Sequence, residues 1–160
     1  VCGQRGGAQE HGHRAGTEDF PGIAAMVAAL VEAEQKKVFL ETERLGWQAM
    51  FEREIVVSVP GVRVIAAGAD RLWNMVSLLM PHGENLRWVA RLDRRGFQVS
   101  TGSACATGKE GPSHVLAAMG FAAEEARRVI RVSAGWETTA GDWRALAAAL
   151  AEVSAEVSAG

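Results

Sequence analysis

Residues 128–153 read RVIRVSAGWETTAGDWRALAAALAEV. A β-branched run at 129–133 is followed by Thr138 and Thr139, either of which can cap a helix. Beyond them, apolar side chains recur at helical spacing, at Trp143, Leu146, Leu150 and Val153. The stretch therefore predicts a strand at 129–133 that leads directly into the final helix.

The same alternation extends through the rest of the chain. A helical pattern runs from residue 21 to about 52, with Pro21 in its first turn, and after a loop of small residues Ser113 can cap a further helix. Strands alternating with helices predict an α/β fold, with a small α+β layer towards the end of the chain. The other expected elements are strands at 55–59, 62–66, 75–80 and 97–100, an amphipathic helix at 85–95 and a helical turn at 124–128.

Composition excludes several classes of protein. The chain has 160 residues, 48% of them hydrophobic, and a formal net charge of -2, so no overall basic field exists to attract nucleic acid or an anionic membrane. No stretch approaches the ~20 apolar residues of a membrane span. Its two cysteines, Cys2 and Cys105, are too far apart in sequence for a paired metal motif or a disulfide framework. We expect a soluble, cytoplasmic protein without a metal site.

The most informative short segment is STGSACATGKEGPSH at 100–114. Cys105 lies among Gly, Ala, Ser and Thr, in backbone open enough for a thiolate to reach a substrate. Lys109 and the following helix start would favour the ionised thiol. Composition alone leaves a second interpretation open, a small cysteine that is merely tolerated in a loop.

The flanking sequence resembles a known family. STGSACATG followed by PSHVLAAMG is similar to the mobile catalytic loop of the cysteine desulfurases, pyridoxal-phosphate enzymes of the class V aminotransferase superfamily. The resemblance implies that Cys105 attacks the sulfur of L-cysteine, which leaves L-alanine and a persulfide on Cys105. It further implies transfer of that sulfur to an acceptor or scaffold protein, as in iron–sulfur cluster assembly.

Two more segments resemble the family in the expected order. GGAQEHGHRAGTED matches the segment whose threonine contacts the cofactor phosphate of the other subunit, which gives Thr17 a cofactor-binding role and implies a homodimer. RVIRVSAGWETT matches the strand whose arginine binds the substrate carboxylate, here Arg131. Taken singly, the first segment could be an ordinary glycine-rich turn and Arg131 could pair with a surface acid.

The resemblance also has departures. In RLWNMVSLLM, Trp73 replaces the proline of the family's Arg-Leu-Pro-Asn pattern. Asp19 stands where asparagine is usual, and Trp136 where a basic or aromatic residue is common. We assign no catalytic role to these positions.

The resemblance implies the C-terminal domain of a fold-type I pyridoxal-phosphate transferase, with a small mixed sheet covered by helices. We expect residues 1–20 to end the large cofactor domain, 21–54 to form a connecting helix, and 55–160 to form the small domain with the cysteine loop.

The lysines limit what this chain can do alone. Pyridoxal-phosphate chemistry needs a lysine that bonds the cofactor, and the chain has only Lys36, Lys37 and Lys109. None lies in the family's Ser-x-His-Lys type of segment. We therefore expect the chain to be the C-terminal part of a longer protein, called the parent protein below, and to be inactive by itself.

Two other hypotheses remain open. The chain could be a non-enzymatic remnant or a persulfide-accepting partner protein that lacks the cofactor lysine. The fold could also serve a selenocysteine lyase or a cysteine sulfinate desulfinase.

His11, His13 and Cys2 lie near one another in the sequence, but they lack the paired spacing of a metal site.

Overall fold

The computed structural model describes residues 6–101 and 113–158, without the side chains of residues 38–41. It divides into two compact units, Val1–Glu41 and Thr42–Gly160, which are described separately. Among the described residues, no helix combines the length and apolar character needed to cross a membrane. The elements in chain order are η1 (Glu10–Gly12), α1 (Phe20–Ser58), β1 (Arg63–Val64), β2 (Met75–Leu79), α2 (Asn85–Asp93), α3 (His114–Ala118), α4 (Ala123–Ala126), β3 (Val129–Ser133) and α5 (Ala140–Ser158).

The first unit consists of the one-turn 3₁₀ helix η1 and the N-terminal part of α1. Asp19, directly before α1, caps the helix: its Oδ1 accepts a hydrogen bond from the Gly22 amide at 3.1 Å, which satisfies one of the free N–H groups of the first turn. Pro21 lies in that first turn, as expected. Five apolar side chains at helical spacing are exposed here, namely Ile23, Met26, Val27, Leu30 and Val31.

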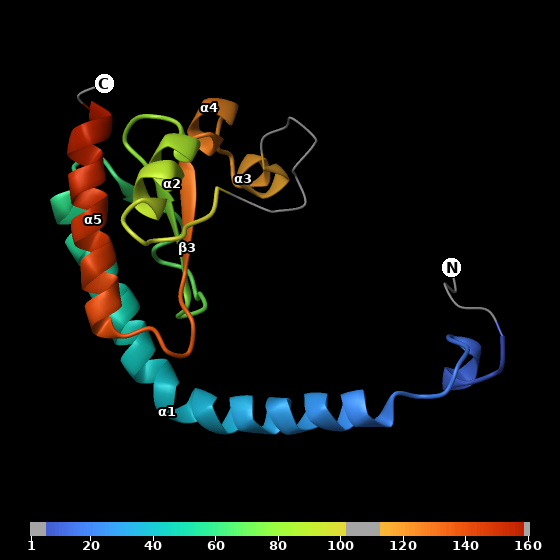
Figure 1. The fold of residues 1–160 in the computed structure, drawn as a ribbon. Helices are drawn as coiled ribbons and strands as arrows, with labels where there is room; N and C mark the ends of the chain where they lie inside the picture. Colours follow the sequence, from blue (N-terminus) through green and yellow to red (C-terminus); the bar gives the residue numbers. More distant parts are fainter. Residues whose placement is uncertain (1–5, 102–112, 159–160) are drawn as a thin grey trace. The chain divides into compact units, whose positions relative to one another are not determined.

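The second unit is built on a three-stranded sheet in the order β1-β2-β3 (Figure 1). Both strand pairs are antiparallel, with Val64 opposite Leu78 and Ser77 opposite Arg131. One face of the sheet packs against the C-terminal part of α1, α2 and α5, while α3 and the Phe121 segment cover part of the other face. The larger core centres on fully buried side chains from α1, β2, α2, β3 and α5, including Phe51, Val76, Leu78, Trp88, Ile130 and Leu150.

Most sequence-based expectations for these elements are confirmed. The strands at 75–79 and 129–133 and the helix at 85–93 are present, and Gly96 follows that helix with a φ of 82°, in the left-handed region that favours glycine. Ser113 caps α3 by accepting from the Leu116 amide at 3.4 Å. Thr139 caps α5 by accepting from the Asp142 amide at 3.2 Å. In return, hydrogen bonds from the backbone and side chain of Thr139 lower the pKa of the Asp142 carboxyl below its ordinary value.

Three predicted strands are wrong in whole or in part. Residues 55–58 continue α1 instead of forming a strand, because Phe51, Ile55 and Val59 lie at four-residue spacing and are all fully buried against the core. The strand predicted at 62–66 shortens to β1, since Ala66 adopts a positive φ of 55°. Of 97–100, only Ser100 pairs with the sheet, through an isolated bridge to Arg131.

The packing of Phe51 gives a test of this core. Its ring is fully buried and lies 4.7 Å from the Trp143 ring, centroid to centroid. Phe51→Ala is expected to lower the free energy of unfolding by about 3–5 kcal/mol, through lost burial and the cavity left behind. Val57→Ala, on the same helix but at a side chain that is 82% exposed, is the matched control and should stay within about 0.5 kcal/mol. Equal effects of the two substitutions in urea unfolding would contradict the helical register of α1.

Candidate active site

The second unit brings Ser100 and Arg131 together. The Ser100 amide donates to the Arg131 carbonyl at 3.0 Å, and the Arg131 amide donates to the Ser100 carbonyl at 2.7 Å. The Arg131 Nη2 also lies 3.4 Å from the Ser100 Oγ. Ser100 is the first residue of the segment that contains Cys105. The segment therefore leaves the sheet directly beside the arginine expected to bind the substrate carboxylate.

Arg131 lies on the sheet face that is not filled by the main core. Its neighbours Ile130 and Val132 are buried in that core, and side chains alternate along a strand, so Arg131 faces the opposite side together with Ser77 across the β2–β3 pair. The Arg131 Nε is buried and has no hydrogen-bond partner among the described residues. Arg131 also forms no ion pair with any described residue. The alternative in which Arg131 pairs with a surface acid is therefore not observed among residues 6–101 and 113–158. A buried guanidinium N–H without a partner fits an incoming carboxylate.

A cavity of about 240 Å³ lies on the same face. Ser77 and Met75 of β2 line it. Arg71 also lines it, and its Nη2 forms an ion pair with the Glu52 Oε1 at 2.7 Å. Since Ser77 is the cross-strand neighbour of Arg131, the cavity continues the surface beside the arginine. The remaining lining residues are apolar: Ile65, Ala66, Leu72 and Met119.

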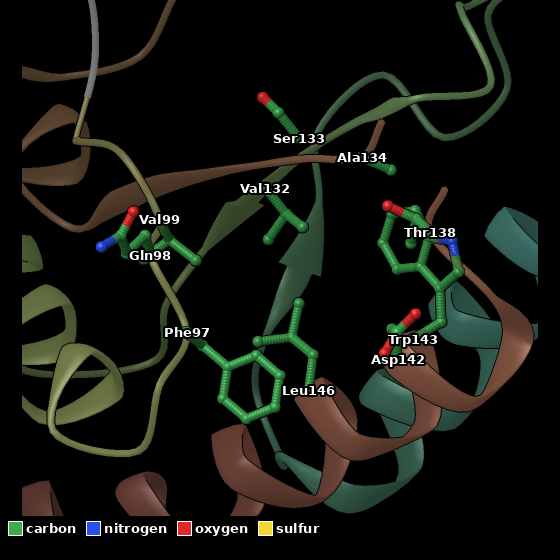
Figure 2. Close-up of a pocket in the computed structure, with 10 residues that line it drawn as sticks. All are labelled: Phe97, Gln98, Val99, Val132, Ser133, Ala134, Thr138, Asp142, Trp143 and Leu146. Atoms are coloured by element: carbon green, nitrogen blue, oxygen red, sulfur yellow. The ribbon is translucent and has the colours of Figure 1, made fainter. Parts of the chain in front are cut away.

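A second cavity, of about 160 Å³, lies on the core side of β3 and is not part of this site (Figure 2). Phe97, Val132 and Leu146 point into it from the segment before Ser100, from β3 and from α5. Arg131 is absent from its lining, because alternation along β3 directs Val132 and Arg131 to opposite faces.

Thr17 belongs to the first unit, within an exposed turn. Arg14 braces this turn by donating through its Nη1 to the carbonyls of Gly16 at 3.1 Å and Thr17 at 3.4 Å. Gly16 has a φ of 94°, a conformation that residues with a side chain rarely adopt. An exposed hydroxyl on a braced turn fits a phosphate contact. Thr17 and Arg131 lie in different units, and their roles stay predictions.

The other candidates are placed as follows. Cys105 and Lys109 lie outside the described residues. Lys36 makes an exposed ion pair on α1, with its Nζ 2.6 Å from Glu32 Oε1, and this contact lowers the pKa of the Glu32 carboxyl. Lys37 is exposed on the same helix. Within the described ranges, no group of three or more His, Cys, Asp or Glu side chains could hold a metal ion.

Sequence reasoning did not assign Ser100 to the site. A usable signal was present, because a short strand was expected at 97–100, directly before the cysteine segment. Local sequence could not identify its partner, Arg131, which lies 31 positions away.

Comparison with known proteins identifies the family. Residues 4–146 match the family model for aminotransferase class V. The chain belongs to the class V aminotransferase family. Its fold is that of the NifS-like proteins: the X-ray structure of a NifS-like protein from Rickettsia africae matches 92% of this chain and 38% of its own, with a TM-score of 0.72 and 27% identity.

Two class V relatives are cysteine desulfurases. That of Cereibacter sphaeroides is 40% identical over 141 residues, which make up 86% of this chain and 35% of the relative. That of Rhodobacter capsulatus is 33% identical over 153 residues, covering 96% of this chain and 40% of the relative. The chain thus spans between a third and two fifths of the length of these relatives.

Proposed function

We propose that the parent protein is a pyridoxal-phosphate-dependent cysteine desulfurase, and that this chain supplies its sulfur-carrying cysteine and its carboxylate-binding arginine. One observation carries the proposal: the backbones of Ser100 and Arg131 are paired, and the Nε of the Arg131 guanidinium is buried without a hydrogen-bond partner in the part of the chain that the structure describes. Membership of the class V family and similarity to two cysteine desulfurases support it.

Arg131 would bind the substrate carboxylate. Its guanidinium lies beside Ser100, the first residue of the cysteine segment, and a charge-assisted contact there would fix the carboxylate of the amino acid. Ser100 Oγ, near the Nη2 atom, would help to hold the guanidinium in place.

Cys105 would act as a thiolate on the substrate sulfur. A sulfur–sulfur bond forms while the carbon–sulfur bond of the substrate breaks, and the electron pair of that bond remains on the carbon, which takes up a proton to give alanine. The sum is one thiol and one cysteine converted into one persulfide and one alanine, so no external oxidant is needed. The persulfide sulfur then passes to an acceptor or scaffold protein.

Pyridoxal phosphate, when bound, supplies the electron sink that makes the substrate carbon reactive. In this chain, the Thr17 hydroxyl on its braced turn would contact the phosphate, and we propose that it does so in the partner protomer of a homodimer. The lysine that bonds the cofactor would come from a part of the parent protein outside this chain, since none of Lys36, Lys37 and Lys109 lies in a Ser-x-His-Lys type of segment. The chain alone is therefore expected to be inactive.

The proposal is tested with the purified parent protein. We expect a yellow protein that releases sulfide from L-cysteine in the presence of a thiol reductant and forms one L-alanine per sulfide. The 160-residue chain, assayed alone at equal concentration, should release none. A parent protein that binds the cofactor but releases no sulfide from L-cysteine would contradict the proposal, and faster turnover of selenocysteine or cysteine sulfinate would redirect it to those substrates.

A further inference from the structure

Two buried polar side chains of α1 hold one end of the sheet. Gln48 is 5% exposed, and its Nε2 donates to the carbonyls of Leu72 and Met75, both at 2.9 Å. Arg44, one helical turn earlier and 8% exposed, donates through its Nη2 to the carbonyl of Trp136 at 2.6 Å. The first pair of contacts fixes the chain where it enters β2, and the second fixes it where it has left β3.

Arg44 is enclosed by tryptophans. Its guanidinium carbon lies 4.3 Å from the centre of the Trp47 ring and 5.6 Å from that of Trp73. The rings of Trp73 and Trp136 meet edge to face at 5.9 Å. Cation–π contacts of this kind are strengthened where water is excluded. Trp73 stands where the family's Arg-Leu-Pro-Asn pattern has a proline, and its ring meets that of Trp136 beside this arginine.

The guanidinium of Arg44 is buried with few polar contacts in the described part of the chain. Its Nε and Nη1 are buried without a hydrogen-bond partner among the described residues. A buried cation with so few partners carries a desolvation cost that only its remaining contacts can offset. Within residues 6–101 and 113–158, those contacts are the tryptophan rings and one hydrogen bond, which goes to the Trp136 carbonyl in the turn after β3.

That turn is connected to Arg131 over a short distance in the chain. The Ala134 amide, between β3 and Trp136, donates to the Asn74 carbonyl at 2.9 Å. Asn74 directly follows Trp73, so the ring pair and this hydrogen bond fix the same two segments against each other. Arg131 lies three residues before Ala134 on β3. The end of β3 is therefore held to the segment before β2 by the Ala134–Asn74 hydrogen bond, and the turn that follows it is held to α1 by Arg44.

We infer that Arg44 is a positioning residue for Arg131. Its guanidinium packs on the tryptophan rings and donates to the Trp136 carbonyl, and this contact fixes the end of β3, the strand that carries the carboxylate-binding arginine. The inference rests on the proposed function, because it assigns Arg44 an effect on substrate binding without any contact with substrate.

The test uses the parent protein with three variants. Arg44→Met keeps much of the side-chain volume but loses the charge and the donors, and it should raise KM for L-cysteine about ten-fold with kcat within about two-fold. Arg44→Lys retains a cation and a donor and should recover most of that loss. Arg53→Met, at an exposed arginine on the same helix, is the matched control and should leave both constants unchanged.

Hydrogen exchange provides a readout that does not depend on activity. In Arg44→Met, the amides of Arg131 and Ala134 should exchange roughly five-fold faster or more, while those of α2 keep their rates. Unchanged exchange at these two amides would overturn the inference whether or not the protein is active. Faster exchange with unchanged KM would also overturn it, because the contact would then be structural only.

An inactive wild-type parent protein would contradict the proposed function, and the exchange comparison would still decide whether Arg44 fixes β3. If Arg44→Met does not fold, Arg44→Gln, which removes the cation and its cation–π contacts, takes its place in both measurements with the same expected outcomes.

Discussion

Replacing Cys105 with serine in the parent protein is expected to abolish sulfide release from L-cysteine, with a fall of about 1000-fold or more. A serine hydroxyl is a far weaker nucleophile toward sulfur than a thiolate, and no persulfide can form on oxygen. The chain offers a matched control in its only other cysteine: Cys2→Ser should retain activity within about two-fold.

The comparison also separates the role of Cys105 from effects on folding. Cofactor colour and the urea unfolding midpoint should be the same in both variants, since the substitution exchanges one small side chain for another. Sulfide release by Cys105→Ser at a rate near that of wild type would show that sulfur leaves by another route.

The second large effect is expected at Arg131. Arg131→Met should raise KM for L-cysteine about 100-fold, because a charge-assisted contact to the carboxylate is lost while the carboxylate still has to leave water. Arg131→Lys should recover only part of this, since an ammonium cannot reproduce the planar fork of the guanidinium. Arg127→Met, at an exposed arginine four residues earlier, is the control and should behave as wild type.

A substrate without a carboxylate makes the assignment specific. Cysteamine carries the thiol and the amine of cysteine only, so wild type and Arg131→Met should process it equally slowly. An Arg131→Met variant with normal KM for L-cysteine, or one that loses cysteamine turnover in the same proportion, would show that Arg131 supports the fold and does not bind the carboxylate.

The sequence predicted those parts of the fold in which local pattern and burial agree. The strand around Arg131 and the final helix follow from a β-branched run and an apolar stripe, and both are present. Residues 55–58 show where this reasoning fails. Their β-branched side chains favour a strand by propensity, but burial of Ile55 one turn beyond Phe51 keeps them helical.

The residues of the candidate site could also be predicted only in part. Thr17, Cys105 and Arg131 could be named from short motifs, because each lies in a segment whose residue types resemble a known pattern. The support behind Arg131 could not. Arg44 reaches the Trp136 carbonyl across 92 positions of sequence, and no local pattern on α1 marks an arginine that will be buried among tryptophans. Such contacts are set by how the elements pack.

The most direct test of sulfur transfer to Cys105 is the mass of the peptide that contains it after the parent protein has turned over L-cysteine. The protein is incubated with the substrate without reductant, blocked with an alkylating agent and digested. We predict a gain of one sulfur atom on the Cys105 peptide, none on the Cys2 peptide and none in Arg131→Met at substrate concentrations well below its KM. Turnover to alanine without added sulfur on Cys105 would contradict the central claim that this chain carries the sulfur.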